Sequence, residues 1–241
     1  MIDTIIVQVP TIVNSMKTCV YIDGFNLYNG CLKTSEYKWL NLVLLPADEV
    51  GAVKYFTAKV SGSPNDVDQP VRQQIYWRAL STVNVEIIEG MFYESTKSMP
   101  LHTTCRMHNG KEPTLVRVRK KEEKGSDVNL ASHLLLDAFQ KRYEQAAVVT
   151  NDSDLGTPIS MVRDVFKLPV VVINPHEHHS KELKKWATKL ARIRVSDLIE
   201  AQFEDELVDV KGPFHKPPSW NTARYEERKF SFLKGGLYRL K

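Results

Sequence analysis

The chain has 241 residues, of which 42% are hydrophobic and 26% charged, with a formal net charge of +4 at neutral pH. This length and composition favour one globular domain with a short appendage, and the sequence contains no internal repeat or low-complexity segment. No uninterrupted apolar run approaches the roughly 18 residues that a membrane-spanning helix needs, so we expect no membrane partner.

Three cysteines, at positions 19, 31 and 105, are an odd number at wide spacings. This pattern argues against a disulfide framework and favours a reducing compartment, for which the cytoplasm is the default expectation. The segment HTTCRMH (102–108) offers three candidate zinc ligands without a fourth at conventional spacing, and HEHH (176–179) is more typical of an exposed loop.

The first 15 residues, MIDTIIVQVPTIVNS, are apolar but lack a basic start and a small-residue cleavage site. We therefore expect residues 1–15 to be a loose N-terminal leader that packs peripherally or is disordered, rather than a signal peptide.

From residue 16 onward, apolar and often β-branched runs alternate with stretches of helical period. Strands are predicted over residues 18–22, 52–60, 84–95, 114–123, 146–150, 168–174 and 191–195. Helices are predicted over residues 70–83, 126–142, 157–167 and 180–190, with a last one beginning at 196 or 197. Alternation of this kind predicts βαβ units, so the fold class is α/β, a three-layer Rossmann-like sandwich with a mainly parallel central sheet over residues 16–205.

Acidic residues stand where the predicted strands end. Asp23 follows the first strand, and Asp152 and Asp154 follow the strand at 146–150. Asp127 lies in the first turn of the helix predicted from residue 126. Parallel strands bring their carboxyl ends to one edge of a sheet, where ligands of open α/β sheets bind, so these four carboxylates can converge. Grouped carboxylates repel one another unless a cation holds them, and Mg²⁺ or Mn²⁺ suits oxygen ligands.

Helix capping is the simpler explanation for Asp127 and Asp154 taken singly, because both stand at positions where helix N-caps are favoured. Capping does not explain Asp23 at a strand end, nor the joint placement of the group. The sequence therefore predicts catalytic and metal-binding roles for Asp23, Asp127, Asp152 and Asp154.

Three segments, YIDGFNLY, KGSDVNLASHLLLDA and VVTNDSDLGTPI, resemble in this order and separation the NYN domain group of the PIN-like nuclease superfamily. The resemblance covers roughly residues 17–200 and implies a PIN-like domain over 16–205 with a metal-dependent ribonuclease or RNA-processing activity. Asp23 and Asn26 match the family's first motif and Asp127 matches its second, while Asp152 and Asp154 match its third. The family often has another acid six residues after the second-motif acid, where this chain has His133. The third motif also departs, with Asn151 and Leu155 in place of Gly and Phe.

Basic residues precede the KGSD turn, in an extended segment whose alternation of Val with Leu and Arg predicts a half-exposed strand. The predicted substrate-binding residues are Asn26, Asn151, Arg117, Arg119, Lys120 and Lys124. An exposed edge strand protected by Lys and Arg explains the same basic residues equally well.

The C-terminal segment 206–241 is basic and aromatic, since residues 211–241 carry eight Lys or Arg against two Glu. A surface of this composition neutralises phosphates and stacks bases, and a tail folded over the core through its aromatic residues is the alternative.

Taken together, these features predict a metal-dependent ribonuclease that hydrolyses RNA phosphodiester bonds, with RNA as its partner. The oligomeric state stays open, and a homodimer is one option. The alternative is an inactive RNA-binding or protein-binding adaptor of the same fold. A nicotinamide enzyme lacks the G-x-G-x-x-G turn, and an oxygenase is ranked below the nuclease because the sequence has no visible haem or flavin fingerprint.

Overall fold

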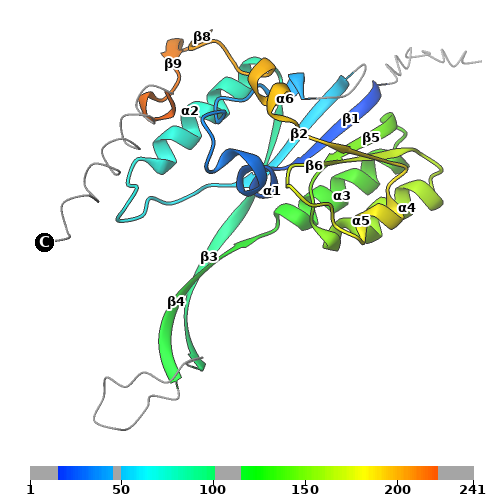
Figure 1. The fold of residues 1–241 in the computed structure, drawn as a ribbon, viewed down its shortest axis with the longest axis horizontal. Coiled ribbons are helices and arrows are strands. Elements are labelled where there is room, and N and C mark those ends of the chain that lie inside the picture. The colour runs from blue at the N-terminus through cyan, green and yellow to red at the C-terminus, as the bar shows by residue number, and fades with distance from the viewer. Residues whose placement is uncertain (1–15, 46–49, 101–114, 222–241) are drawn as a thin grey trace, which may run out of the picture.

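The structure is a computed structural model that describes residues 16–45, 50–100 and 115–221. Its centre is a seven-stranded sheet with the order β4-β3-β2-β1-β5-β6-β7 (Figure 1). The strands are β1 (Met16–Asp23), β2 (Val50–Ala58), β3 (Glu86–Pro100), β4 (Leu115–Lys124), β5 (Tyr143–Val149), β6 (Val170–Asn174) and β7 (Lys189–Arg192). Every neighbouring pair is parallel except β3 and β4. The predicted α/β class with a mainly parallel sheet is confirmed.

Helices cover both faces of the sheet (Figure 1). They are α1 (Gly24–Leu27), α2 (Gln69–Thr82), α3 (Ser126–Phe139), α4 (Gly156–Asp164), α5 (Leu183–Trp186) and α6 (Val195–Glu200). Adjacent residues of β1 point to opposite faces, so Ile22 packs in one core with α1, α2 and α6 and Tyr21 in the other with α3, α4 and α5. The three layers follow from this alternation in strands that are buried on both sides.

Three predicted helices differ from the structure, and the one expected over 157–167 ends at Asp164. The helix expected over 180–190 is reduced to the four residues of α5, because the chain turns extended at Ala187 before β7 begins. The helix expected over 126–142 ends at Phe139. Within this helix Val128 is 68% exposed, while Leu134 and the acidic Asp137 are buried.

Strands β3 and β4 form a long antiparallel arm that projects away from the body of the molecule (Figure 1). Along β4, Val116 and Val118 are partly buried while their neighbours are exposed, which confirms the predicted half-exposed strand. The segment 102–108, which offered candidate zinc ligands, lies outside the described residues, as does the leader 1–15.

The described part of the basic C-terminal segment packs on α2. It forms a hairpin of β8 (Glu206–Asp209) and β9 (Gly212–His215), followed by a short 3-10 helix (Pro218–Trp220). Arg78 on α2 donates to both carboxylate oxygens of Asp209 and lies 4.1 Å from the ring centre of Phe214. Trp220 contacts the rings of Trp39 and Tyr76. Residues 206–221 therefore fold over the core through aromatic side chains, which was the alternative to a surface that binds phosphates and bases.

Within the described ranges, no helix combines the length and the apolar character that crossing a membrane requires.

Candidate functional site

The candidate site lies where the strand order of the sheet reverses. From β1 the chain proceeds through β2 and β3 on one side, and then returns to place β5, β6 and β7 on the other. The carboxyl ends of β1 and β5 therefore border the crevice at which ligands of doubly wound sheets bind. Asp23 is the last residue of β1, and Asp152 lies three residues beyond the end of β5.

Asp23 is the most buried carboxylate of the site, with an exposure of 4%. Its Oδ1 accepts a hydrogen bond from the backbone N–H of Asn26 at 2.9 Å, and its Oδ2 accepts one from the Thr150 hydroxyl at 3.1 Å. Burial raises the pKa of Asp23 to about 6, with Asp127 and Asp152 adding to the rise and the two hydrogen bonds opposing it. The first strand thus ends in a carboxyl group whose charge is costly near neutral pH.

Asn26 connects the two strand ends. Its Oδ1 accepts from the backbone N–H of Asn151 at 2.9 Å and lies 3.0 Å from Nε2 of His176. Asn151 in turn donates from Nδ2 to the carbonyl of His178 and accepts at Oδ1 from the N–H of Ser180. Both asparagines therefore position backbone around the site, a role that the sequence did not indicate.

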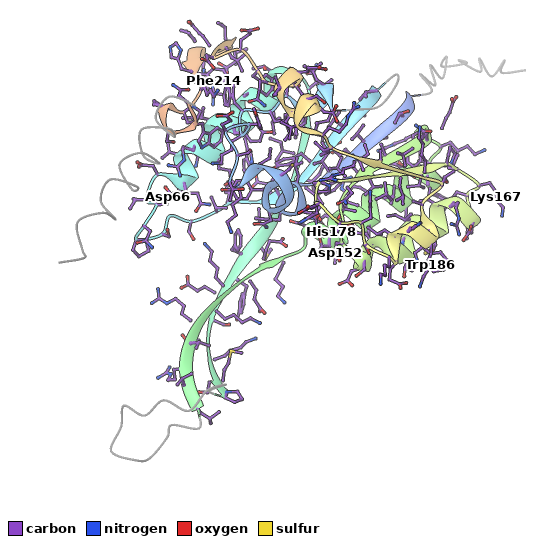
Figure 2. All side chains as sticks on the ribbon, in the orientation of Figure 1. Asp66, Asp152, Lys167, His178, Trp186 and Phe214 are labelled. Carbon is purple, nitrogen blue, oxygen red and sulfur yellow. The ribbon has the colours of Figure 1, made fainter. Side chains whose placement is uncertain are left out.

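The other three predicted carboxylates border the same corner of the sheet. Asp152 accepts at Oδ1 from the N–H of Asp154, and the backbone N–H of Asp152 donates to the hydroxyl of Thr150. Figure 2 shows Asp152 close to His178, between α1 and the layer of α3, α4 and α5. Burial raises the pKa of Asp127, and the charges of Asp152, Glu123 and Asp154 add to the rise. The structure therefore brings the four acids close enough to influence one another.

The acids are not arranged as a ready metal site. Among the described residues, no group of three or more His, Cys, Asp or Glu side chains is placed to hold a metal ion. Both oxygens of Asp23 already accept hydrogen bonds from the protein. We therefore derive no chemical step through a metal, and Mg²⁺ or Mn²⁺ stays a prediction.

His133, at the position where the resembled family often has an acid, does not join this corner. Its Nδ1 lies 3.3 Å from Nζ of Lys54, and its ring packs edge-on against Phe56. Lys54 is buried and donates to Asp137 at 2.6 Å, and the same carboxylate oxygen accepts from the hydroxyl of Tyr21 at 2.7 Å. His133 thus belongs to a buried polar network between β1, β2 and α3.

The predicted basic residues lie along the projecting arm, from Arg117 far from its root to Lys124, which is three residues before Asp127. Arg117 is eight residues before Gly125, at which the arm ends, a distance of roughly 27 Å along an extended strand. Arg119 pairs with Glu94, whereas Lys120 and Lys124 pair with Glu122. These contacts neutralise part of the positive charge, and RNA and a homodimer stay predictions.

A second feature beside the carboxylates was missed by sequence reasoning. An open cleft of about 1010 Å³ lies between α1, the loop from β2 to α2, helix α2, the root of the arm and the final 3-10 helix. Its aromatic lining consists of Phe25, Tyr28, Tyr55, Tyr76, Trp77, Phe92 and Trp220. Gly24 also lines it, directly after Asp23, and a Cβ there would lie 2.7 Å from the carbonyl oxygen of Phe56. No local motif unites these residues, because they come from distant segments.

A doubly wound α/β protein with a carboxylate corner and an adjoining aromatic cleft is the class that these features define. No family model matches the chain. It is 30% identical, over 238 residues, to the 6-hydroxy-3-succinoylpyridine 3-monooxygenase HspA of Pseudomonas putida (strain DSM 28022 / S16), covering 85% of this chain and 75% of that one. A solved structure of a Vibrio parahaemolyticus protein of unknown function gives a TM-score of 0.46 at 17% identity, over 75% of this chain and 94% of that one.

The chain therefore belongs to the family of HspA, which is an enzyme family. The name of that relative is that of an oxidoreductase, and this overturns the prediction of a metal-dependent ribonuclease. The ranking of an oxygenase below a nuclease was wrong. The ranking relied on carboxylates at strand ends, which many α/β enzymes share, and on the absence of a familiar cofactor motif.

Proposed function

We propose that this chain is an oxidoreductase of the monooxygenase class that acts on a hydroxylated aromatic or heteroaromatic compound. The observation that carries the proposal is the 30% identity to a 6-hydroxy-3-succinoylpyridine 3-monooxygenase over 85% of the chain. The aligned part makes up 85% of this chain, so the similarity includes most of the described residues.

The reaction consumes one molecule of O₂ for each substrate molecule. One oxygen atom enters the substrate, and the other leaves as water after taking up two electrons and two protons. We assign the two electrons to a reductant of the dihydronicotinamide or dihydroflavin class, which supplies them as a hydride equivalent.

The aromatic cleft supports a planar substrate. Rings in a protein gain about 0.5–1.5 kcal/mol from favourable stacking or edge contacts beyond the burial of their area. In this cleft, Phe25 and Phe92 pack edge to face with ring centres 5.7 Å apart, and Tyr76 and Trp220 lie 6.1 Å apart. None of the four site acids lines this cleft, but Gly24, which directly follows Asp23 in the chain, does. We therefore place the reacting end of the substrate at Gly24.

Oxygen uptake tests the proposal. The purified chain is mixed with a dihydronicotinamide or a reduced flavin and with 6-hydroxy-3-succinoylpyridine, 6-hydroxynicotinate or 4-hydroxyphenylacetate, and O₂ is followed with an electrode. We expect substrate-dependent O₂ consumption, and mass spectrometry after reaction under ¹⁸O₂ should find one labelled oxygen in the product. O₂ consumption that is the same without substrate, or a product without the label, would refute the monooxygenase.

The resemblance of the three motifs to the NYN domain group stays a proposal about architecture. The order of strands and the position of the acids at the reversal of that order support it.

A further inference from the structure

One end of the aromatic cleft is positively charged. Lys38 and Arg72 both line the cleft. Arg72 comes from the first turn of α2 and forms a short ion pair with Asp66, on the loop that precedes this helix (Figure 2). Lys38 comes from the segment between the first helical turns and β2, and its ammonium makes no hydrogen bond or ion pair with another described residue. Lys33 and Lys121 also line the cleft, so four cations face the two carboxylates of Asp66 and Asp68 and the lining has a net positive charge.

The surroundings of Lys38 disfavour its charge as the cleft stands. Lys38 is half-buried, and burial lowers the pKa of its ammonium. The nearby charge of Arg72 lowers this pKa further, and Asp66 only partly opposes the effect. Asp68 also lines the cleft but is exposed. A buried cation without a partner is costly, and a ligand that carries a negative charge removes that cost.

Other residues of the cleft indicate which kind of ligand carries the negative charge. Tyr28, on the turn that follows α1, lines the cleft, and burial and Asp66 raise its pKa while Arg72 lowers it, so its hydroxyl lies near the same charges. Farther along α2, the indole N–H of Trp77 is buried without a hydrogen-bond partner among the described residues. A ligand that fits this cleft is therefore an aromatic ring joined to an acidic group.

We propose that Lys38, with Arg72 beside it, binds the carboxylate of an aromatic acid whose ring lies against the aromatic lining of the cleft. The choice of an aromatic substrate rests on the proposed function, but the charge preference rests on the cleft. Lys38 is then a specificity-determining residue that selects acids over neutral aromatic compounds.

A carboxylate matches this end better than the phosphates of a nucleotide. Phosphate sites commonly combine several backbone N–H groups of a glycine-rich turn with a cation. Here Arg72 is already paired, and Lys121, another cation of the cleft, donates to Ser61 and lies 4.6 Å from the ring centre of Phe92. Lys33 also lines the cleft but is exposed, so Lys38 is the half-buried cation that is left, a point charge that suits one carboxylate.

The test measures binding without turnover. Isothermal titration calorimetry, in the absence of O₂ and of reductant, compares 6-hydroxy-3-succinoylpyridine with its methyl ester, which keeps the ring but has no charge. The proteins are the wild-type chain, Lys38→Met, Lys38→Arg and the control Lys181→Met, which removes an exposed charge outside the cleft. Thermal unfolding of each variant verifies folding.

We expect the wild type to bind the acid at least tenfold more tightly than the ester, because hydrogen bonds to charged groups are the stronger ones. Lys38→Met should weaken acid binding about tenfold or more and leave ester binding unchanged, whereas Lys38→Arg and Lys181→Met should keep most of the preference. Equal binding of acid and ester to the wild type, or no binding of the acid at millimolar concentration, overturns the proposal even if Lys38→Met fails to fold.

Two further outcomes separate this proposal from the proposed function. Selective binding of the acid without any substrate-dependent O₂ consumption refutes the monooxygenase and leaves the carboxylate site standing. Substrate-dependent O₂ consumption with an unchanged KM in Lys38→Met refutes the carboxylate site alone. If Lys38→Met instead weakens the binding of a dihydronicotinamide dinucleotide and spares the acid, the site serves a phosphate and the proposal is wrong.

Discussion

The buried carboxyl of Asp23 should make the protein less stable above neutral pH than it would be with an uncharged residue. Asp23→Asn keeps the shape of the side chain and an oxygen that can accept from the backbone N–H of Asn26. Its amide can donate to the hydroxyl of Thr150, which at present donates to the carboxylate. The substitution therefore removes the charge with little loss of hydrogen bonding.

The magnitude follows from the pKa of Asp23, which rises from 3.8 to about 6 on folding. At about 1.4 kcal/mol per pKa unit, ionisation in the folded state costs about 3 kcal/mol. Between these two values the folded state binds more protons than the unfolded state, so the contribution of Asp23 to stability falls as pH rises from about 4 to about 6. About 2 kcal/mol of this loss lies between pH 4.5 and 7.5. Asp23→Asn does not have this dependence.

Urea unfolding in the presence of EDTA measures the effect at pH 4.5, 6 and 7.5. The free energy of unfolding of Asp23→Asn, relative to that of the wild type, should increase by about 2 kcal/mol across this range. Glu177→Gln, which removes an exposed carboxylate near the site, should change stability by less than about 0.5 kcal/mol at every pH. A difference between Asp23→Asn and wild type that does not vary with pH would show that burial does not raise this pKa.

Three further predictions concern the network, the carboxylate corner and the cleft. Asp137→Asn should lower the free energy of unfolding by about 3–5 kcal/mol in urea titrations, because the buried Lys54 loses the carboxylate of Asp137. A loss under 1 kcal/mol would contradict the importance of this ion pair. Asp152→Asn should reduce substrate-dependent O₂ consumption about 100-fold without changing the melting temperature, and normal turnover would remove Asp152 from the site. Gly24→Ala should weaken binding of aromatic acids in calorimetry, since its Cβ would lie 2.8 Å from the ring of Tyr55, and unchanged affinity would mean that the cleft adjusts freely.

The fold was predictable to the extent that it depends on local pattern. The apolar runs that became β1 and β5 are buried on both faces, and such strands are recognisable from β-branched composition and from the acid or turn residue that follows. The position of Asp23 and Asp152 at neighbouring strand ends followed from the parallel arrangement alone. Parallel strands all end at the same edge of the sheet. The position of these acids could therefore be predicted without knowing any individual contact.

Features that depend on distant partners were not predictable. Asp137 has the helical position of a core residue but the chemistry of a surface residue, and it is buried because Lys54, 83 residues away, supplies a charge. The same pairing explains why His133 lies in the network rather than with the site acids. Similarly, the arm projects because β4 pairs only with β3, so Arg117 and Arg119 lie away from the site, whereas Lys121 at the root of the arm lines the cleft.

The prediction of a nuclease was wrong because carboxylates at this corner of the sheet occur in α/β proteins with different functions. Carboxylates at the reversal point of an α/β sheet can serve metal binding, proton transfer or simple positioning of the chain, so they define a place for chemistry rather than one reaction. What distinguishes an aromatic substrate from a phosphodiester is the surface next to that place. Here that surface combines aromatic rings from β2, α1, α2, β3 and the C-terminal segment, and its cationic end comes from Lys38 and Arg72. Tyr55 and Tyr76 are buried core residues and the other rings are partly buried. The packing of the C-terminal hairpin on α2 completes the wall with Trp220. Segments that are continuous in sequence therefore predicted where the four acids lie, while the residues that line the cleft come together only in the folded chain.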